Sequence, residues 1–237
     1  MPDVELIRWE LPGPYRVAFS TRRGGVSEGP YASLNLGRRT GDDVGRVDAN
    51  RRILCSEVGA DADDLALNFQ VHSAIVNRAE PGVRGESQGD ALWTDVPGLP
   101  VAALAADCVP VALARRGAKP GIAVAHAGWI GILAGILEAA TETLGDDLDA
   151  AIGPSAGPCC YEVGEDVARP YRERFGDDIV AAGKLDLWRA AELTLNEAGV
   201  ERVHRVDLCT ICNPDRFFSH RRDGKPRGVQ GVVAVVA

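Results

Sequence analysis

The chain has 237 residues, of which 46% are hydrophobic and 25% charged, a composition typical of a soluble globular protein. This length is enough for one large α/β domain or two small ones. The net charge of −8 argues against a nucleic-acid partner, because nonspecific binding to nucleic acid needs a basic surface.

The N-terminus lacks the basic and then apolar pattern of a secretory signal. Residues 121–137 contain a single plainly polar side chain, His126, but Ala127-Gly128 interrupt the segment and its second half continues amphipathically. We therefore expect a buried strand, turn and helix there and no membrane partner. A cytoplasmic location is expected, with all six cysteines reduced.

Apolar periodicity predicts the elements in chain order. Strands are expected at residues 17–21, 67–72, 89–95, 101–106, 111–114, 122–125, 203–208 and 231–236, and helices at 48–60, 129–144, 165–175 and 185–198. A Gly/Pro-rich turn is expected to begin at residue 150. Since no repeat or linker interrupts this order, we predict a single domain over residues 1–237.

Three side chains that can bind a metal follow apolar strands. They are His72, Cys108 and His126, and three protein ligands with a fourth position left for water are typical of a catalytic zinc site. The separations of 36 and 18 residues match no short motif, and a lone strand histidine is often a core residue. From spacing alone, a metal site and a structural role both stay open.

The other cysteines give a weaker pattern. Cys209-Thr210-Ile211-Cys212 is a C-x-x-C segment, which can form half of a zinc knuckle or a redox pair. The only neighbouring pair that could complete it, Cys159-Cys160, is vicinal and has a poor shape for chelation. We therefore expect Cys209 and Cys212 not to be ligands. The usual nucleotide-binding loops and the G-x-S-x-G motif are absent from the sequence.

Several segments together resemble the YfiH-type family of laccase-domain proteins, first regarded as polyphenol oxidases and later described as purine nucleoside phosphorylases. The segments are Phe19-Ser20-Thr21-Arg22-Arg23-Gly24-Gly25, Ser33-Leu34-Asn35-Leu36-Gly37, Gln70-Val71-His72, Ala106-Asp107-Cys108-Val109-Pro110, His126-Ala127-Gly128-Trp129, Gly157-Pro158-Cys159-Cys160-Tyr161 and Phe217-Phe218-Ser219-His220-Arg221-Arg222-Asp223. They run in order over nearly the whole chain, so the resemblance is specific.

The resemblance implies a mixed-sheet α/β sandwich and a zinc ion on His72, Cys108 and His126. It also implies phosphorolysis of adenosine, inosine, guanosine and methylthioadenosine with phosphate as co-substrate, and adenosine deamination as a second activity. The expected partners are thus small molecules.

Further residues are assigned roles from their chemistry and position. Arginine binds phosphate through a planar fork, which makes Arg22 and Arg221 candidates for the phosphate. Asp107 is a candidate acid or base beside Cys108, or alternatively a strand-end cap. Asn35 is expected to bind substrate. Gln70 either binds a base edge or satisfies backbone groups near His72.

Three alternative functions stay open. A cysteine hydrolase would use Cys108 as nucleophile and His126 as base, but it leaves His72 without a role. A copper-dependent polyphenol oxidase is disfavoured, because four histidines cannot supply a multicopper cluster. A non-catalytic purine-binding module would keep the site without turnover.

The chain departs from the family at two positions that are usually basic. Ile130 follows the tryptophan of His-Ala-Gly-Trp, and Val229 lies just before the last strand. We expect weaker phosphate binding as a result, which Ile130→Arg, and with less reason Val229→Arg, should reverse.

Overall fold

The last strand of the chain is buried on both of its faces. In the computed structural model, which describes residues 4–81 and 84–237, Val232 and Ala234 of this strand contact the core between two sheets. Val233 and Val235 pack against the opposite side, which a helix covers. Because both faces are covered, the segment is a continuous apolar run and not an alternation.

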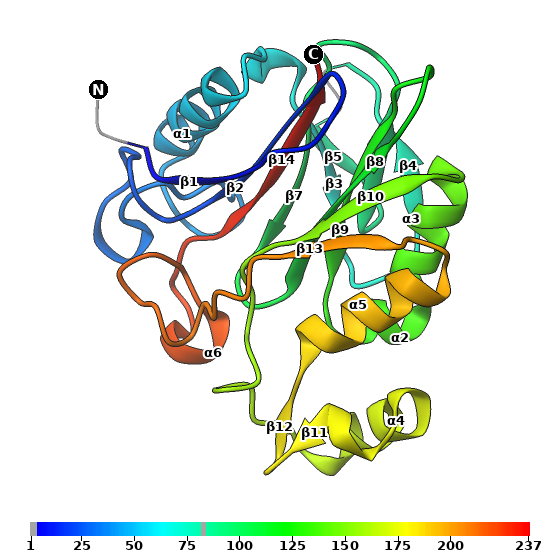
Figure 1. The fold of residues 1–237 in the computed structure, drawn as a ribbon. Helices are drawn as coiled ribbons and strands as arrows, with labels where there is room; N and C mark the ends of the chain where they lie inside the picture. The colour runs from blue at the N-terminus through cyan, green and yellow to red at the C-terminus, as the bar shows by residue number, and fades with distance from the viewer. Residues whose placement is uncertain (1–3, 82–83) are drawn as a thin grey trace.

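Two six-stranded sheets pack face to face around this arrangement (Figure 1). The first sheet has the order β1 (Leu6–Trp9), β2 (Tyr15–Ser20), β14 (Gln230–Val236), β7 (Val101–Ala105), β3 (Ala66–Phe69) and β5 (Arg84–Gln88). The second has the order β13 (Arg202–Arg205), β10 (Leu148–Ile152), β8 (Val109–Arg115), β9 (Ile122–Ala127), β6 (Ala91–Thr94) and β4 (Val76–Arg78). Each sheet contains parallel and antiparallel pairs, so the predicted mixed-sheet α/β sandwich is confirmed.

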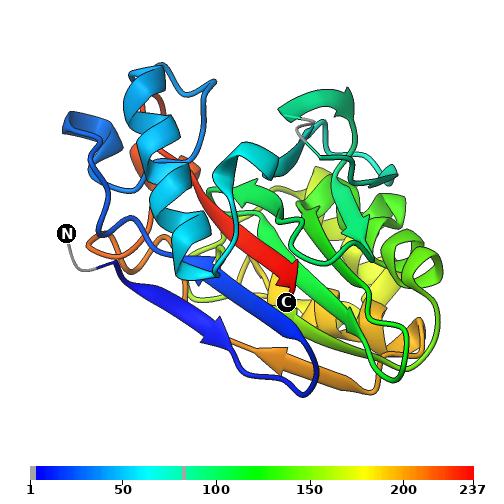
Figure 2. The same ribbon diagram turned by 90° about the horizontal axis from the view of Figure 1, so that it is seen from above.

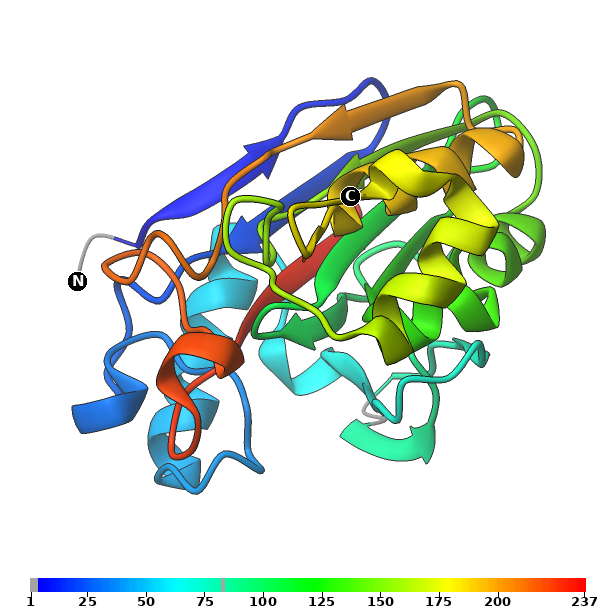
Figure 3. The same cartoon turned by 90° about the horizontal axis from the view of Figure 1, so that it is seen from below.

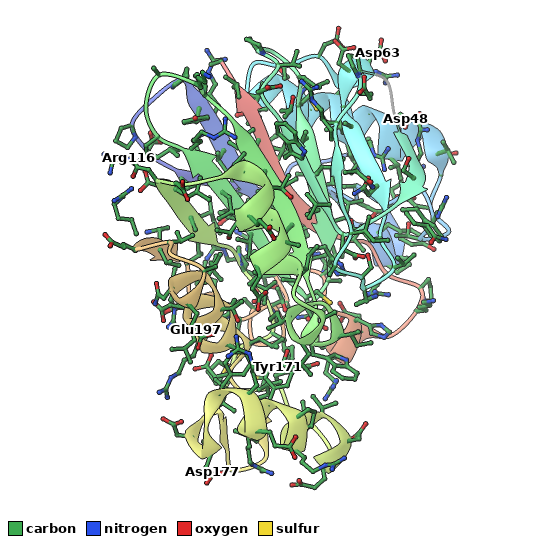
Figure 4. All side chains as sticks on the ribbon, turned by 90° about the vertical axis from the view of Figure 1, so that its right-hand side faces the viewer. Asp48, Asp63, Arg116, Tyr171, Asp177 and Glu197 are labelled. Atoms are coloured by element: carbon green, nitrogen blue, oxygen red, sulfur yellow. The ribbon has the colours of Figure 1, made fainter. Side chains whose placement is uncertain are left out.

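Helices cover the outer face of each sheet (Figure 2). Helix α1 (Val44–Glu57) packs on the first sheet, and α2 (Trp129–Ala134), α3 (Ile136–Leu144), α4 (Glu165–Phe175) and α5 (Leu187–Glu197) lie on the side of the second. The remaining elements are η1 (Gly29–Tyr31), η2 (Ala62–Asp64), η3 (Asp177–Ile179), α6 (His220–Asp223) and the small sheet of β11 (Val180–Ala181) and β12 (Lys184–Leu185). Figure 4 places Tyr171 where α4 meets the other helices and Asp177 at the outer end.

Several predicted boundaries are wrong for identifiable reasons. Helix α1 begins at Val44, because the side chain of Asp43 accepts the N–H of Arg46 as an N-cap. The helix expected over residues 129–144 breaks at Gly135, whose φ of 91° is left-handed.

Two further segments also differ from the prediction. The turn expected from residue 150 begins only after β10, which occupies Leu148–Ile152. The strand expected over residues 67–72 ends at Phe69, which leaves Gln70 and His72 on a loop.

Strand register decides where the candidate ligands lie. β8 and β9 are antiparallel with Val109 opposite Ala127, so the residue just before β8 lies next to the end of β9. β3 runs parallel to β7, so the residues that follow these two strands leave the first sheet at the same edge. Among the described residues, no helix is long and apolar enough to cross a bilayer.

Candidate metal centre

His72, Cys108 and His126 converge at the edge where β3, β7 and β9 end. Their ligand atoms all lie within 4.8 Å of one another, and Cys108 Sγ is 3.7 Å from His72 Nε2. The two imidazole rings are 4.8 Å apart between centroids and nearly perpendicular. Cys108 is half-buried and His126 is buried, while His72 is exposed at the mouth of the site.

The backbone around the three side chains takes conformations that few residues tolerate. His72 has a φ of 61° and Asp107 one of 92°, both in the left-handed region. Gly128 lies so close to the cluster that a Cβ there would be 2.8 Å from His72 Cδ2 and 2.9 Å from Cys108 Sγ. Only glycine fits at position 128 of the His-Ala-Gly-Trp segment, because a larger residue would collide with these two side chains.

Asp90 holds both histidines in place. Its buried carboxylate is 2.9 Å from His126 Nδ1, which leaves Nε2 of that ring for a ligand. The same carboxylate accepts the backbone N–H groups of Val71, His72 and Ser73 and the hydroxyl of Ser73. The sequence prediction missed this residue. Its only signal was an acidic end on the strand expected at residues 89–95.

The charges of the cluster are coupled. Burial alone would raise the pKa of the Cys108 thiol, but His126 and His72 outweigh it and lower that pKa to about 6. Burial alone would lower the pKa of His126, yet Cys108 and Asp90 raise it to about 9. The metal-free cluster is thus a thiolate beside an imidazolium. The pKa of the Asp90 carboxyl, in spite of its burial, is held below its usual range by the bonds from His126 and Ser73.

This donor set fits one divalent ion. Two imidazoles and one thiolate are suitable ligands for zinc or copper, and a carboxylate on the second nitrogen of His126 is the usual support of a metal-bound histidine. Three ligands leave a position open, as in catalytic sites.

A cavity of about 730 Å³ opens over the three side chains. Its basic lining residues are Arg38, Arg39, Arg51, Lys225 and Arg227, and within the described residues no acidic side chain lines it. Although the whole chain is acidic, this cavity is locally cationic and suits an anion or a phosphate-bearing reaction.

Arg227 differs from the other cations of the cavity. Its Nε is buried and has no hydrogen-bond partner in the part of the chain that the structure describes, while its Nη1 donates to the carbonyl of Gly224 at 3.3 Å. The sequence prediction passed over Arg227 because it considered only position 229. Both Arg227 and Val229 line the cavity.

The arginines predicted to bind phosphate lie elsewhere. Arg22 donates to the carbonyls of Ala32 and Pro214 and stacks on Phe218, and Arg221 donates to the carbonyl of Glu162. Neither is among the residues that line the cavity. Each of the two arginines instead joins two loops that are far apart in the sequence and that lie side by side in Figure 3. Their role in substrate binding stays a prediction.

Asn35 and Gln70 make bonds inside the protein. Asn35 is fully buried, and its Oδ1 accepts the N–H groups of Gly37 and Val229 while its Nδ2 donates to Thr40 and Asp42. Gln70 lines the cavity, but its amide exchanges two bonds with the backbone of Leu104, at 2.7 and 2.8 Å. These contacts match the structural alternative for Gln70.

Asp107 anchors the loops that follow β13. Its carboxylate accepts the hydroxyls of Thr210 and Ser219 and the backbone N–H of Arg221, at 2.6, 3.0 and 2.6 Å. A catalytic role for Asp107 stays a prediction, whereas its contacts describe a residue that positions the turn before Cys108.

The fold and this centre define a class of α/β sandwich proteins with a His, Cys, His cluster under a cationic cavity. The sequence model of the family described as "Multi-copper polyphenol oxidoreductase laccase" matches residues 16–237. The chain is 35% identical to a purine nucleoside phosphorylase of Pseudomonas aeruginosa, over 92% of each protein. It is 34% identical to the purine nucleoside phosphorylase YfiH of Escherichia coli, over 91% of this chain and 92% of the relative.

A solved structure agrees with these sequence matches. That of a Neisseria meningitidis protein is 32% identical, covers 98% of each chain and superposes with a TM-score of 0.88. The chain belongs to the YfiH-type family of laccase-domain proteins, as its sequence motifs predicted.

The lowered pKa of Cys108 predicts how the metal-free protein reacts with iodoacetamide. Only the thiolate reacts, so alkylation of Cys108 should reach half its maximal rate near pH 6, well below the value of about 8.5 for an ordinary cysteine. The measurement is peptide mass spectrometry after timed alkylation of chelator-treated protein. His126→Ala should move the midpoint upward. A midpoint at or above pH 8.5 in the unmodified chain would contradict the ion pair.

The crowding at Gly128 predicts a loss of metal affinity. Gly128→Ala should weaken zinc binding by about tenfold or more, because the new methyl group must displace His72 and Cys108. Competition with a chromophoric chelator measures the effect. Gly131→Ala is the matched control, since its Cβ would meet no atom closer than 3.4 Å. Equal affinity of the two variants would show that Gly128 does not shape the centre.

Proposed function

We propose that this protein is a zinc-dependent purine nucleoside phosphorylase. The observation that carries the proposal is the side chain of Arg227, which lines the cavity that also holds His72, Cys108 and His126 and whose Nε has no partner among the described residues. The names of the relatives support the same activity. A cavity of about 730 Å³ also falls in the range of about 300–1,000 Å³ that is usual for small-molecule sites.

Phosphorolysis breaks the bond between C1′ of the ribose and the purine nitrogen while a phosphate oxygen bonds to C1′. Arg227 lines the cavity and can hold the phosphate through a charge-assisted bond from its guanidinium. Burial, and then the charge of Arg227, lower the pKa of His220, which also lines the cavity, so its neutral ring can donate a hydrogen bond to the departing purine. Phe69 offers an exposed ring for base stacking, and the guanidinium of Arg39 lies 3.9 Å from its centre.

A zinc ion held by His72, Cys108 and His126 would supply a Lewis acid, and one thiolate ligand would leave it with a charge of about +1. Adenosine, inosine, guanosine and methylthioadenosine are the proposed substrates, with adenosine deamination as a second activity. Deamination needs water and no phosphate, so the two reactions separate by phosphate dependence.

A cysteine hydrolase is the second candidate, and one observation favours it. The cluster has the arrangement of a catalytic triad, with Cys108 as nucleophile, His126 as base and Asp90 as the group that orients the base. In a hydrolase of this kind His72 has no chemical task, although it lies 3.7 Å from Cys108 Sγ. Metal content therefore separates the two candidates.

The decisive experiment incubates freshly purified protein with a panel of nucleosides, with and without phosphate, and measures free base, ribose 1-phosphate and inosine. His72→Ala and Cys108→Ser should each lose zinc from this centre and at least about 100-fold of the activity, by the usual scale for catalytic groups. Cys55→Ser is the control, since Cys55 is a buried residue of α1 that does not line the cavity. Full zinc occupancy of this centre in the two ligand variants would reject the proposal.

The position of Arg227 predicts a defect specific to phosphate. Arg227→Gln should raise the apparent KM for phosphate by about tenfold or more, because a charge-assisted bond of about 1.5–3 kcal/mol is lost. Zinc content should not change. Adding Val229→Arg to this variant should restore part of the loss, since both positions line the cavity.

Ile130→Arg serves as the comparison for this experiment. The sequence led us to expect that Ile130→Arg would strengthen phosphate binding, but Ile130 is 44% exposed on α2 and is not among the residues lining the cavity. A cation introduced there should therefore leave the phosphate dependence unchanged, in contrast to one at Val229. An unchanged phosphate dependence in Arg227→Gln would remove Arg227 from the site.

A further inference from the structure

Four cysteines from two distant segments meet outside the cavity. Cys159 and Cys160 lie in the turn after β10, and Cys209 and Cys212 lie in the turn after β13. β10 and β13 are parallel neighbours, and a bridge between Ser155 and Cys209 continues their pairing into the turns. All four sulfur atoms lie within 4.8 Å of one another. The vicinal pair and the C-x-x-C pair thus face each other.

This arrangement removes the reason for dismissing Cys209 and Cys212 as ligands. A tetrahedral zinc ion with bonds of about 2.3 Å places its sulfurs about 3.8 Å apart. The Sγ of Cys212 is 3.2 Å from that of Cys159 and 2.8 Å from that of Cys160, so a small outward shift makes room for an ion. A disulfide, with a bond of about 2.05 Å, would use only two of the four sulfurs.

Backbone donors at Cys209 stabilise negative charge on one of the four sulfurs. The backbone N–H of Gly157 donates to Cys209 Sγ at 3.3 Å, and the backbone of Cys212 donates to the same sulfur. Two cations hold the turns: Lys184 donates to the carbonyl of Cys159, and Arg222 donates to the carbonyls of Thr210 and Ile211.

We propose that Cys159, Cys160, Cys209 and Cys212 form a second metal site, which binds one zinc ion through four thiolates. An ion of charge +2 and four thiolates leave −2. Lys184 offsets part of this charge, whereas Arg222 is already paired with Asp223. Binding releases the thiol protons to solvent and needs no oxidant. Sulfurs this close fit a single ion, because an iron–sulfur cluster places several atoms between them. Four protein ligands close the site, so its role is structural.

The site fastens the turns that hold Asp107. The hydroxyl of Thr210, next to Cys209, donates to the Asp107 carboxylate, and the N–H of Ala156 donates to the Asp107 carbonyl. Asp107 precedes Cys108, so the four-cysteine site braces the backbone of the catalytic ligand from outside the cavity. It acts as a positioning device and touches no substrate.

The test counts metal ions per chain by mass spectrometry of protein purified under reducing conditions. The unmodified chain should hold two zinc ions. Cys209→Ser with Cys212→Ser should hold one and should melt at a lower temperature, and Cys55→Ser should keep two. His72→Ala should lose the other ion and keep the four-cysteine site, so failure of either centre is distinguishable from failure of the other.

Cobalt gives a readout that does not depend on activity. In cobalt-loaded Cys108→Ser the four-thiolate site should keep an intense sulfur-to-cobalt charge-transfer band, which disappears when Cys212→Ser is added. If the double cysteine variant does not fold, zinc titration of the metal-stripped unmodified chain should still saturate at two ions. Saturation at one ion would overturn the proposal. So would a Cys160–Cys212 disulfide that persists under reducing conditions in protein without a second ion.

Discussion

The hydrogen bond between Asp90 and His126 is the contact on which the geometry of the candidate metal centre depends. A single buried carboxylate fixes the ring of His126 through Nδ1 and the loop of His72 through three consecutive backbone N–H groups. It therefore connects the end of β3 in one sheet with the end of β9 in the other. The pair is desolvated, so removing the carboxylate would leave these donors without their acceptor, which costs much more than a surface ion pair.

The same contact explains why His72 tolerates a left-handed backbone. A non-glycine residue at a φ of 61° costs free energy, and the chain accepts it only where neighbouring bonds hold the conformation. The N–H groups of Val71, His72 and Ser73 all converge on Asp90, which requires a tight loop. That loop turns the imidazole of His72 back toward Cys108. Strain at one ligand is thus maintained by the group that orients the other.

The elements with strong apolar patterns were predicted well, and the features that depend on distant contacts were not. Helix α4 was expected at its observed bounds, and β14 began within one residue of its expected start. The loop of His72 could not be predicted, because its conformation depends on Asp90 from another strand. Arg22 looked like an anion ligand by its charge, but its bonds to Ala32 and Pro214 are visible only in three dimensions.

The roles of Cys159 and Arg227 show the same limit. Vicinal cysteines are a poor chelate alone, and only the pairing of β10 with β13 brings the second pair to them. Val229 lies where the resembling family is usually basic, and Arg227, two residues earlier, is a cation that lines the same cavity. A sequence comparison that considers only position 229 does not detect the guanidinium at position 227.

The donor set also bears on the two chemistries that the family descriptions suggest. A multicopper centre needs many histidines, and only two of the four in this chain reach the cluster: His204 lies on β13 and His220 on α6. A blue copper site usually adds a weak axial methionine, and the only methionine in the sequence is Met1. A cationic cavity would not assist the oxidation of a phenol by copper, whereas it would bind the phosphate that phosphorolysis requires. The side chain of Arg227, which lines the same cavity as the three candidate ligands, supports the proposed phosphorolysis and has no evident task in polyphenol oxidation.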